Sequence, residues 1–167
     1  IEMQLPYLAH LIKKQDVKHI KIIPILVGNP STNDLSHYID VLLPYFLNER
    51  NLFVISSDFC HWGQRFDYTY YNEDHGQIYQ SIKKLDLLAL KYIQQQDYNG
   101  WRQYLTKYRN TICGRYPISI LLLLISAAKK EKYNYHNQLL YYKQSSQVVD
   151  IYDSSVSYAS LAVYQER

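Results

Sequence analysis

Two short stretches of the sequence concentrate side chains that can do chemistry. In the first, Ser56–Gly63, a carboxylate (Asp58), a thiol (Cys60), an imidazole (His61) and an indole (Trp62) follow one another within five residues. A neighbouring carboxylate can orient a histidine for acid–base chemistry or for a place beside a metal. The same spacing also occurs in ordinary turns, where the carboxylate caps the turn and the histidine binds a carbonyl. Spacing alone therefore leaves both interpretations of Asp58 and His61 open.

The second stretch is Asn110–Pro117, which contains Cys113 beside Gly114 and Arg115. A helix is predicted to begin directly after it, and both a helix N-terminus and a nearby arginine favour the thiolate form of a cysteine. Such a thiolate could serve as a soft metal ligand or as a nucleophile, whereas a buried structural cysteine is the alternative. Arg115 could bind a carboxylate or a phosphate with its planar fork, or form a surface ion pair.

The remaining reactive side chains carry weaker signals. Cys60 lies next to Phe59 and Trp62, so it is interpreted as a packed thiol. The five other histidines have no partners at a useful spacing, and the sequence has no glycine-rich phosphate loop and no paired zinc spacing. The candidate chemistry is therefore confined to the two stretches.

Alternating strand and helix patterns predict how these stretches are positioned. Apolar periodicity indicates helices over residues 1–14, 34–48, 77–95, 97–108 and 118–130. Strand patterns cover residues 19–28, 52–55, 138–143 and 156–164. This order predicts an α/β domain with a mixed central sheet flanked by helices. The first stretch would then follow the strand 52–55, and ligand sites gather at the carboxyl ends of such strands.

The composition excludes several classes of protein. The net charge is +3 and the longest basic run is Lys129–Lys132, which does not indicate nucleic-acid binding. The longest uncharged apolar run, Ile118–Ala128, is too short to span a bilayer, so no membrane insertion is expected. Two cysteines do not form a disulfide framework, and a reducing cytoplasmic location, with the nucleus as a second one, is expected. The sequence opens at Ile1 without an initiator methionine, which suggests a piece of a longer protein.

Several motifs, taken in order along the chain, resemble those of the Memo family (mediator of receptor-kinase-driven cell motility). They are Ile1–Tyr7, Ile23–Gly28, Ser56–Phe66, Asn110–Arg115, Gln144–Gln147 and Asp153–Ala159. The resemblance implies the fold of class III extradiol ring-cleaving dioxygenases, and it implies that residues 1–167 are the C-terminal part of a single Memo-like domain.

The resemblance also implies roles for individual residues. Cys113 matches the family's cysteine metal ligand, whose two histidine partners come from the N-terminal half of the domain and lie outside this chain. His61 matches the additional pocket histidine, an acid–base residue, and Asp58 matches the carboxylate beside it. The family resemblance implies copper or iron as the metal and a redox-linked role, without ring-cleaving activity.

Two functions follow as expectations. The first is a metal-dependent redox protein, in which an oxidoreductase activity stays open. The second is a signalling or adaptor module that binds phosphotyrosine peptides in the same pocket, with Arg115 contacting the anion.

Overall fold

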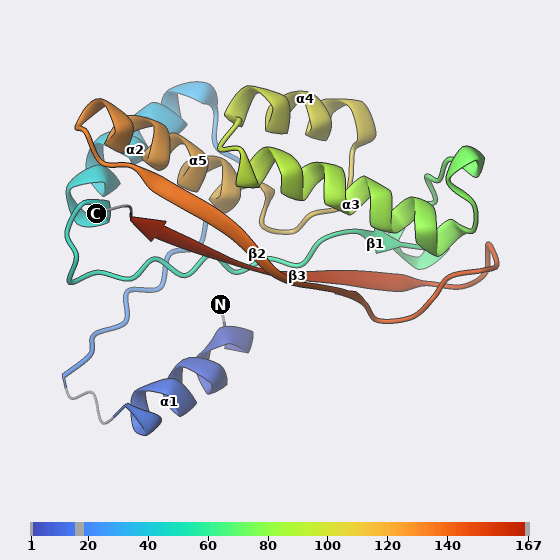
Figure 1. Ribbon diagram of the computed structural model, residues 1–167, viewed down its shortest axis with the longest axis horizontal. Helices are drawn as coiled ribbons and strands as arrows, with labels where there is room; N and C mark the ends of the chain where they lie inside the picture. The colour runs from blue at the N-terminus through green and yellow to red at the C-terminus, as the bar shows by residue number, and fades with distance from the viewer. Residues whose placement is uncertain (1, 16–18, 166–167) are drawn as a thin grey trace.

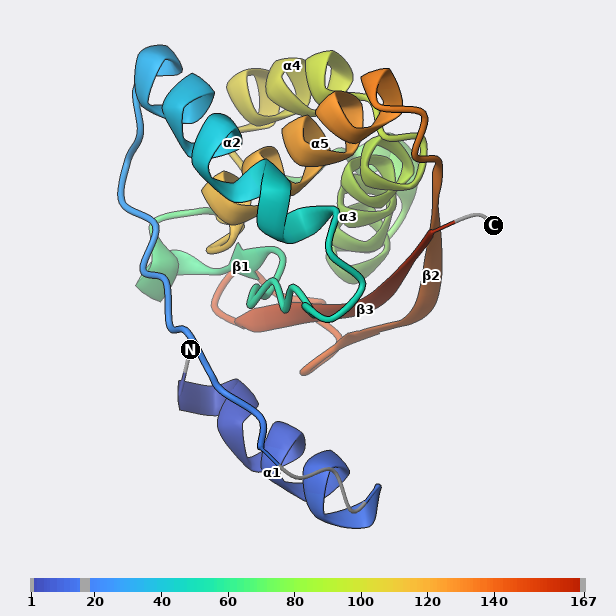
Figure 2. The same cartoon turned by 90° about the vertical axis from the view of Figure 1, so that its left-hand side faces the viewer.

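The computed structural model describes residues 2–15 and 19–165 and contains a small sheet covered by layers of helices. The sheet has three antiparallel strands in the order β1-β3-β2, with β1 at His61–Trp62, β2 at Tyr135–Gln144 and β3 at Ser155–Gln165. Figures 1 and 2 show four helices on one side of this sheet and the first helix apart from them, on the other side. The described chain is thus a mixed α/β structure.

Five α-helices have the following bounds: α1 at Leu5–Lys14, α2 at Thr32–Phe46, α3 at Ile78–Gln94, α4 at Tyr98–Tyr108 and α5 at Arg115–Lys130. Three short 3-10 turns accompany them: η1 at Glu2–Gln4, η2 at Gln64–Phe66 and η3 at Glu73–His75. All five predicted helices are confirmed to within a few residues. Their periodic apolar faces and their end signals are local features, which the sequence displays directly.

Local hydrogen bonds explain where α2 and α4 begin. The Ser31 side chain accepts a hydrogen bond from the Asp34 amide, and the Asp34 carboxylate accepts one from the Ser31 amide, which forms a capping box. At α4, the Asp97 carboxylate accepts a hydrogen bond from the Gly100 amide at 2.9 Å. Each cap satisfies amides that the first helical turn leaves unpaired.

The hydrophobic core lies between α3 and the helices and strands that pack on it. One face of α3 contributes buried apolar residues, which are Ile78, Ile82, Leu85, Ala89, Leu90 and Ile93. Trp62, Trp101 and Leu122 are fully buried in the same cluster and come from β1, α4 and α5. The core therefore joins the elements that flank both reactive stretches.

The long hairpin of β2 and β3 supports the core from one side. The strands pair from Tyr135 with Gln165 to Gln144 with Ser157, and one irregularity in register lies between Leu139 and Tyr141. The strand predictions for residues 138–143 and 156–164 are confirmed, and both strands extend beyond the predicted ranges. β3 also pairs with the short strand β1, so the first reactive stretch is anchored to the hairpin.

The other two predicted strands are wrong in this structure. Residues 19–28 and 52–55 form no β-ladder within the described chain. Their side chains are largely exposed, and Leu26 is 91% and Leu52 82% exposed. An apolar run becomes a strand only when a neighbouring strand pairs with its backbone, and neither run has one here. The sheet accordingly shows only antiparallel pairs, where a mixed sheet was expected.

No helix in the described ranges 2–15 and 19–165 is both long enough and apolar enough to cross a membrane.

Candidate metal centre

The first loop of the candidate site is held against β3. The Phe59 amide donates a hydrogen bond to the Ser157 carbonyl at 2.8 Å, and the Ser157 amide donates to the Cys60 carbonyl at 2.9 Å. Phe59, Cys60 and Trp62 are buried, whereas His61 stays half-buried. The loop is therefore fixed by its apolar neighbours, and His61 remains accessible.

The second loop, residues 109–114, connects α4 to α5. Arg109 adopts a left-handed backbone conformation with φ of 49° and ends α4. Cys113 then follows, immediately before Gly114 at the start of α5. Figure 1 shows this connection beneath α3 and α5, next to the chain that leads into β1.

Two hydroxyl groups cross-link the two loops. The Thr111 hydroxyl accepts a hydrogen bond from the His61 amide at 2.7 Å and donates one to the His61 carbonyl at 3.0 Å. In the opposite direction, the Ser57 hydroxyl accepts one from the Gly114 amide at 3.0 Å and donates one to the Asp58 carbonyl at 2.6 Å. Each loop thus supplies one side chain that binds the backbone of the other.

These links bring Asp58, His61 and Cys113 together. His61 Nε2 lies 2.9 Å from Asp58 Oδ1 and 3.5 Å from Cys113 Sγ. One donor atom from each of the three residues falls within 4.8 Å of the other two. The grouping that the sequence predicted across some fifty residues is therefore present, although the strand that was expected to present the first loop is not.

The geometry argues against a nucleophile–base–acid triad. In such a triad the carboxylate binds one ring nitrogen of the histidine and the nucleophile binds the other. Here the carboxylate and the thiol both approach Nε2. Partial burial of the thiol, together with Asp58, also raises the pKa of Cys113 to about 11. Cys113 is therefore a thiol at neutral pH, which is a poor nucleophile.

The same geometry fits a bound cation. Asp58 Oδ1 is a buried atom and accepts no well-formed hydrogen bond, despite its closeness to His61 Nε2. A carboxylate oxygen, an imidazole nitrogen and a sulfur that face one point are the usual donors for a transition metal. A metal also favours the thiolate, because a coordinating thiol loses its proton. The residues present therefore fit a metal, and their mixed set does not select among the transition metals.

The other predicted site residues have clear positions. Cys60 is fully buried, as expected for a packed thiol, and burial raises the pKa of its thiol far above the ordinary value. The Arg115 guanidinium donates a hydrogen bond to the Ile112 carbonyl at 3.2 Å and lies 5.0 Å from the centre of the Tyr116 ring. It also favours the Cys113 thiolate by its charge, although burial and Asp58 outweigh this.

Three residues around the site were missed by sequence analysis. Ser57 and Thr111 link the loops, and the Phe66 ring contacts the His61 ring edge-on at 5.0 Å between centroids. Serine and threonine are common residues, so their identity alone does not single out Ser57 or Thr111 as part of a site. Their position within the two reactive stretches was the only available signal.

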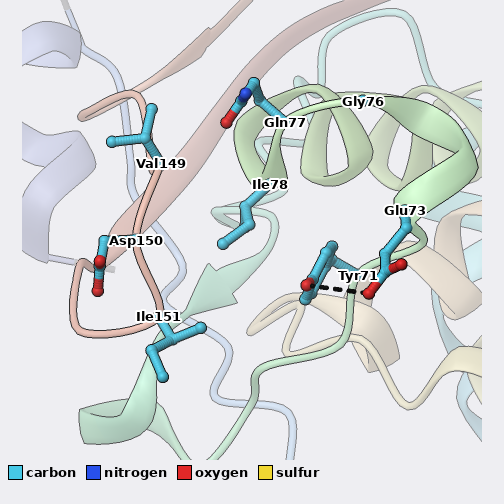
Figure 3. Close-up of a pocket in the computed structure, with 8 residues that line it drawn as sticks. All are labelled: Tyr71, Glu73, Gly76, Gln77, Ile78, Val149, Asp150 and Ile151. Carbon is cyan, nitrogen blue, oxygen red and sulfur yellow. Dashed lines mark hydrogen bonds between the residues drawn. The ribbon is translucent and has the colours of Figure 1, made fainter.

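A separate hollow lies away from these three donors. Figure 3 shows it between Tyr71 and Glu73 on one side and Val149 and Ile151 on the other, near the start of α3. It encloses about 320 Å³, and none of Asp58, His61 and Cys113 lines it. The candidate metal centre is thus a convergence of side chains rather than part of this hollow.

Comparison with known proteins gives the same family as the sequence motifs. The profile of the family described as Memo-like protein matches residues 1–162. Protein MEMO1 of Danio rerio and that of Homo sapiens are each 46% identical to the chain over 163 residues, which is 98% of the chain and 54% of the relative. A MEMO1 family protein of Schizosaccharomyces pombe is 38% identical over 180 residues, covering 96% of the chain and 57% of that protein. The chain spans about half the length of these relatives.

Proposed function

Because the chain belongs to the Memo family, we propose that it contributes Cys113, His61 and Asp58 to a metal-binding, redox-linked pocket. The observation that carries the proposal is the convergence of these side chains from two loops, with donor atoms within 4.8 Å of one another. The buried Asp58 Oδ1, which lies 2.9 Å from His61 Nε2 and accepts no well-formed hydrogen bond, supports it further. We propose copper or iron as the metal, since a thiolate suits Cu(I) and a histidine suits both.

Each residue has a proposed role. Cys113 is the metal ligand, and two histidines outside this chain complete the ligand set. His61 Nε2, 3.5 Å from the sulfur, receives the thiol proton when Cys113 becomes a thiolate. Asp58, 2.9 Å from the same nitrogen, stabilises the resulting imidazolium. When bound, copper or iron supplies one-electron redox chemistry, and a metal-dependent oxidoreductase activity is the enzymatic form of this proposal.

Metal analysis of the natural protein tests the role of Cys113. We expect Cys113→Ala to lose stoichiometric copper or iron, because the thiolate is removed. Cys60→Ala is the matched control, since it removes the other thiol, which is fully buried. Undiminished metal content in Cys113→Ala would remove this residue from the site.

We also propose that residues 1–167 form the C-terminal part of one Memo-like domain, with the mixed sheet of class III extradiol dioxygenases. Two observations support this. The relatives are about twice as long as the matched region, and the apolar side chains of residues 20–26 have no cover in the described chain. Residues 1–167 expressed alone should be poorly soluble, because exposed apolar and unpaired segments aggregate. A monomeric product that melts cooperatively would contradict this.

A second function is binding of phosphotyrosine peptides at the same pocket. The observation that favours it is the position of Arg115 at the start of α5, two residues after Cys113, where its guanidinium donates a hydrogen bond to the Ile112 carbonyl at 3.2 Å. An arginine fork binds phosphate in a bidentate manner. Titration with matched phosphorylated and unmodified peptides tests this function. Equal affinities would reject it, and Arg115→Lys should weaken phosphopeptide binding while the charge is retained.

The metal-binding function needs Cys113 to stay reduced. The two cysteines are free in the structure, and we propose a reducing location, the cytoplasm or also the nucleus.

A further inference from the structure

A carboxylate is buried in the middle of α3, beneath the candidate metal centre. Asp86 is 0% exposed and lies between the core residues Leu85 and Ala89. Burial raises the pKa of Asp86 to about 6, so burying its charge is unfavourable. A carboxylate at such a position is retained only when its hydrogen bonds compensate for the lost hydration. The partners of Asp86 therefore indicate what it does.

One carboxylate oxygen of Asp86 binds both loops of the site. Oδ1 accepts a hydrogen bond from the Cys60 amide at 3.3 Å and another from Asn110 Nδ2 at 3.1 Å. Cys60 lies between Asp58 and His61 in the first loop. Asn110 immediately precedes Thr111, whose hydroxyl holds the His61 backbone. A single atom on a rigid helix thus connects the two segments that carry the metal donors.

The other oxygen connects this point to the sheet. Oδ2 accepts a hydrogen bond from the Tyr142 hydroxyl at 2.9 Å, and Tyr142 lies 3.2 Å from the Ser157 hydroxyl. The backbone of Ser157 in turn pairs with the first loop at Phe59 and Cys60. The first loop is therefore held from α3 and from β3 at once.

We propose that Asp86 is a positioning residue that keeps the Asp58–His61 loop and the Cys113 loop in register. This inference rests on the proposed metal-binding function. Asp86 does not reach the metal donors themselves, and it acts through the Cys60 amide and the Asn110 side chain. Groups that hydrogen-bond a metal ligand directly change metal affinity by about 10- to 100-fold when they are removed, and Asp86, which acts through intermediates, should lie at the lower end of this range.

The test compares three variants of the natural protein in two measurements. The first measurement is Co(II) titration followed by the thiolate charge-transfer band, and the second is amide hydrogen exchange at residues 58–61 and 111–113. Asp86→Ala should weaken Co(II) binding by about tenfold or more, and it should speed exchange in both loops. Asp86→Asn keeps an oxygen acceptor for Cys60 and Asn110, so it should retain most of the affinity.

Leu90→Ala is the matched control for core destabilisation. Leu90 lies one turn further along α3, is fully buried in the same core and has an apolar side chain that forms no hydrogen bond to either loop. At equal folded fraction this variant should leave Co(II) affinity and loop exchange unchanged. Equal effects of Asp86→Ala and Leu90→Ala would reduce Asp86 to an ordinary core residue and overturn the proposal.

The two measurements separate this inference from the metal proposal. If the unsubstituted protein does not bind Co(II), metal binding through Cys113 fails, whereas hydrogen exchange still decides the role of Asp86. If Asp86→Ala does not fold, Asn110→Ala removes the link from Asp86 to the second loop, together with the hydrogen bond from Asn110 to the Tyr104 hydroxyl, and leaves the link to Cys60 in place. It should then speed exchange at 111–113 more than at 58–61, and uniform exchange in both loops would contradict the proposal.

Discussion

The chain contains two regions that differ in how their apolar residues are used. In the N-terminal region, residues 2–15 and 19–54, no described residue is buried. In the packed region, residues 59–165, apolar side chains of α3, α4, α5 and the sheet form one core. Both regions are rich in Ile and Leu, so composition does not separate them. The difference teaches that an apolar pattern predicts burial only when a partner surface is present.

The helix α2 is where the two regions meet. It packs on α5 through one face, and the half-buried residues on that face are Leu35, Ile39, Leu42, Leu43 and Phe46. Tyr38, Val41 and Tyr45 lie on an adjacent face of α2 and are exposed. Figure 2 shows α2 on the outer side of the helical layer, whereas α1 lies apart. The contrast between the regions can therefore be tested by paired substitutions, one in each.

The largest expected contrast comes from leucine truncation. Leu122→Ala in the core should lower the free energy of unfolding by about 3 kcal/mol, because it leaves a cavity. In residues 1–167 taken alone, Leu26→Ala should change it by less than about 0.5 kcal/mol, since Leu26 is 91% exposed there; in the natural protein, where the rest of the domain is proposed to cover residues 20–26, the loss should be larger. Urea unfolding followed by the fluorescence of the buried Trp62 and Trp101 measures both. A large loss in Leu26→Ala would mean that the N-terminal region packs against something in solution.

Acid should affect the two regions in opposite directions. Burial raises the pKa of Asp86 from 3.8 to about 6, so the folded state binds more protons than the unfolded state between these values. The stability that this proton uptake contributes is complete below pH 3.8 and is lost as the pH rises through 6. The loss is about 3 kcal/mol. Unfolding at a series of pH values should show it, and Asp86→Asn should remove it.

Asp34 in the N-terminal region provides the opposite case. Hydrogen bonds from the Ser31 side chain and amide lower the pKa of Asp34. Its contribution is therefore present above pH 3.8 and is lost as the pH falls through the lowered value. Asp34→Asn should remove acid sensitivity of α2 and leave the Asp86 effect intact. A pH profile unchanged by Asp86→Asn would refute the assignment of the first effect.

Glycine substitution gives the next contrast. A Cβ added at Gly114 would lie 2.4 Å from Ser57 Cβ and 2.9 Å from the Ser56 carbonyl oxygen, so Gly114→Ala should push the two loops apart. We expect a loss of about 2 kcal/mol, as for other overpacked positions. Gly28→Ala is the control, because nothing lies within 4 Å of its added Cβ. Thermal melting compares the two, and equal melting temperatures would show that the loops yield easily.

The smallest contrast concerns helix caps. Asp97→Ala removes the cap of α4, whose first turn includes the buried Gly100, and should lower global stability by about 1 kcal/mol. Ser31→Ala removes the cap of α2, in which no residue is buried. It should speed amide exchange in the first turn of α2 without changing the urea midpoint. A shift of that midpoint by Ser31→Ala would show that α2 unfolds together with the core.

The sequence predicted the parts of the fold that depend on local patterns. All five helices and the strand segments within β2 and β3 follow from hydrophobic periodicity, which acts within a few residues, whereas the pairing of β2 with β3 was not predicted. The runs 19–28 and 52–55 have equally apolar patterns, but a strand also needs a backbone partner. The partner comes from a distant part of the chain, so the sequence of the run itself does not show whether a partner is present.

The residues of the candidate site that can do chemistry were predictable from the sequence. The residues that hold the two loops in place were less so. Asp58, His61 and Cys113 stand out by their chemistry, and the family resemblance linked the two loops. Thr111 and Ser57 could not be found, because their bonds cross between loops. Asp86 did leave a signal, since it interrupts the buried apolar stripe of α3 between Leu85 and Ala89.

The contact between His61 and Cys113 joins residues that are 52 positions apart in the chain. This contact closes a loop that contains α3 and α4, and the hydrogen bonds between Thr111 and His61 and between Ser57 and Gly114 close it as well. A covalent link across a loop of this length restricts the unfolded chain and is worth about 4 kcal/mol in the chain-entropy description. Here the link is made of hydrogen bonds, which break when the protein unfolds, so it does not restrict the unfolded chain. The order of the two loops therefore depends on the core that holds them, and a locally destabilised core would separate Cys113 from His61 before the chain unfolds completely.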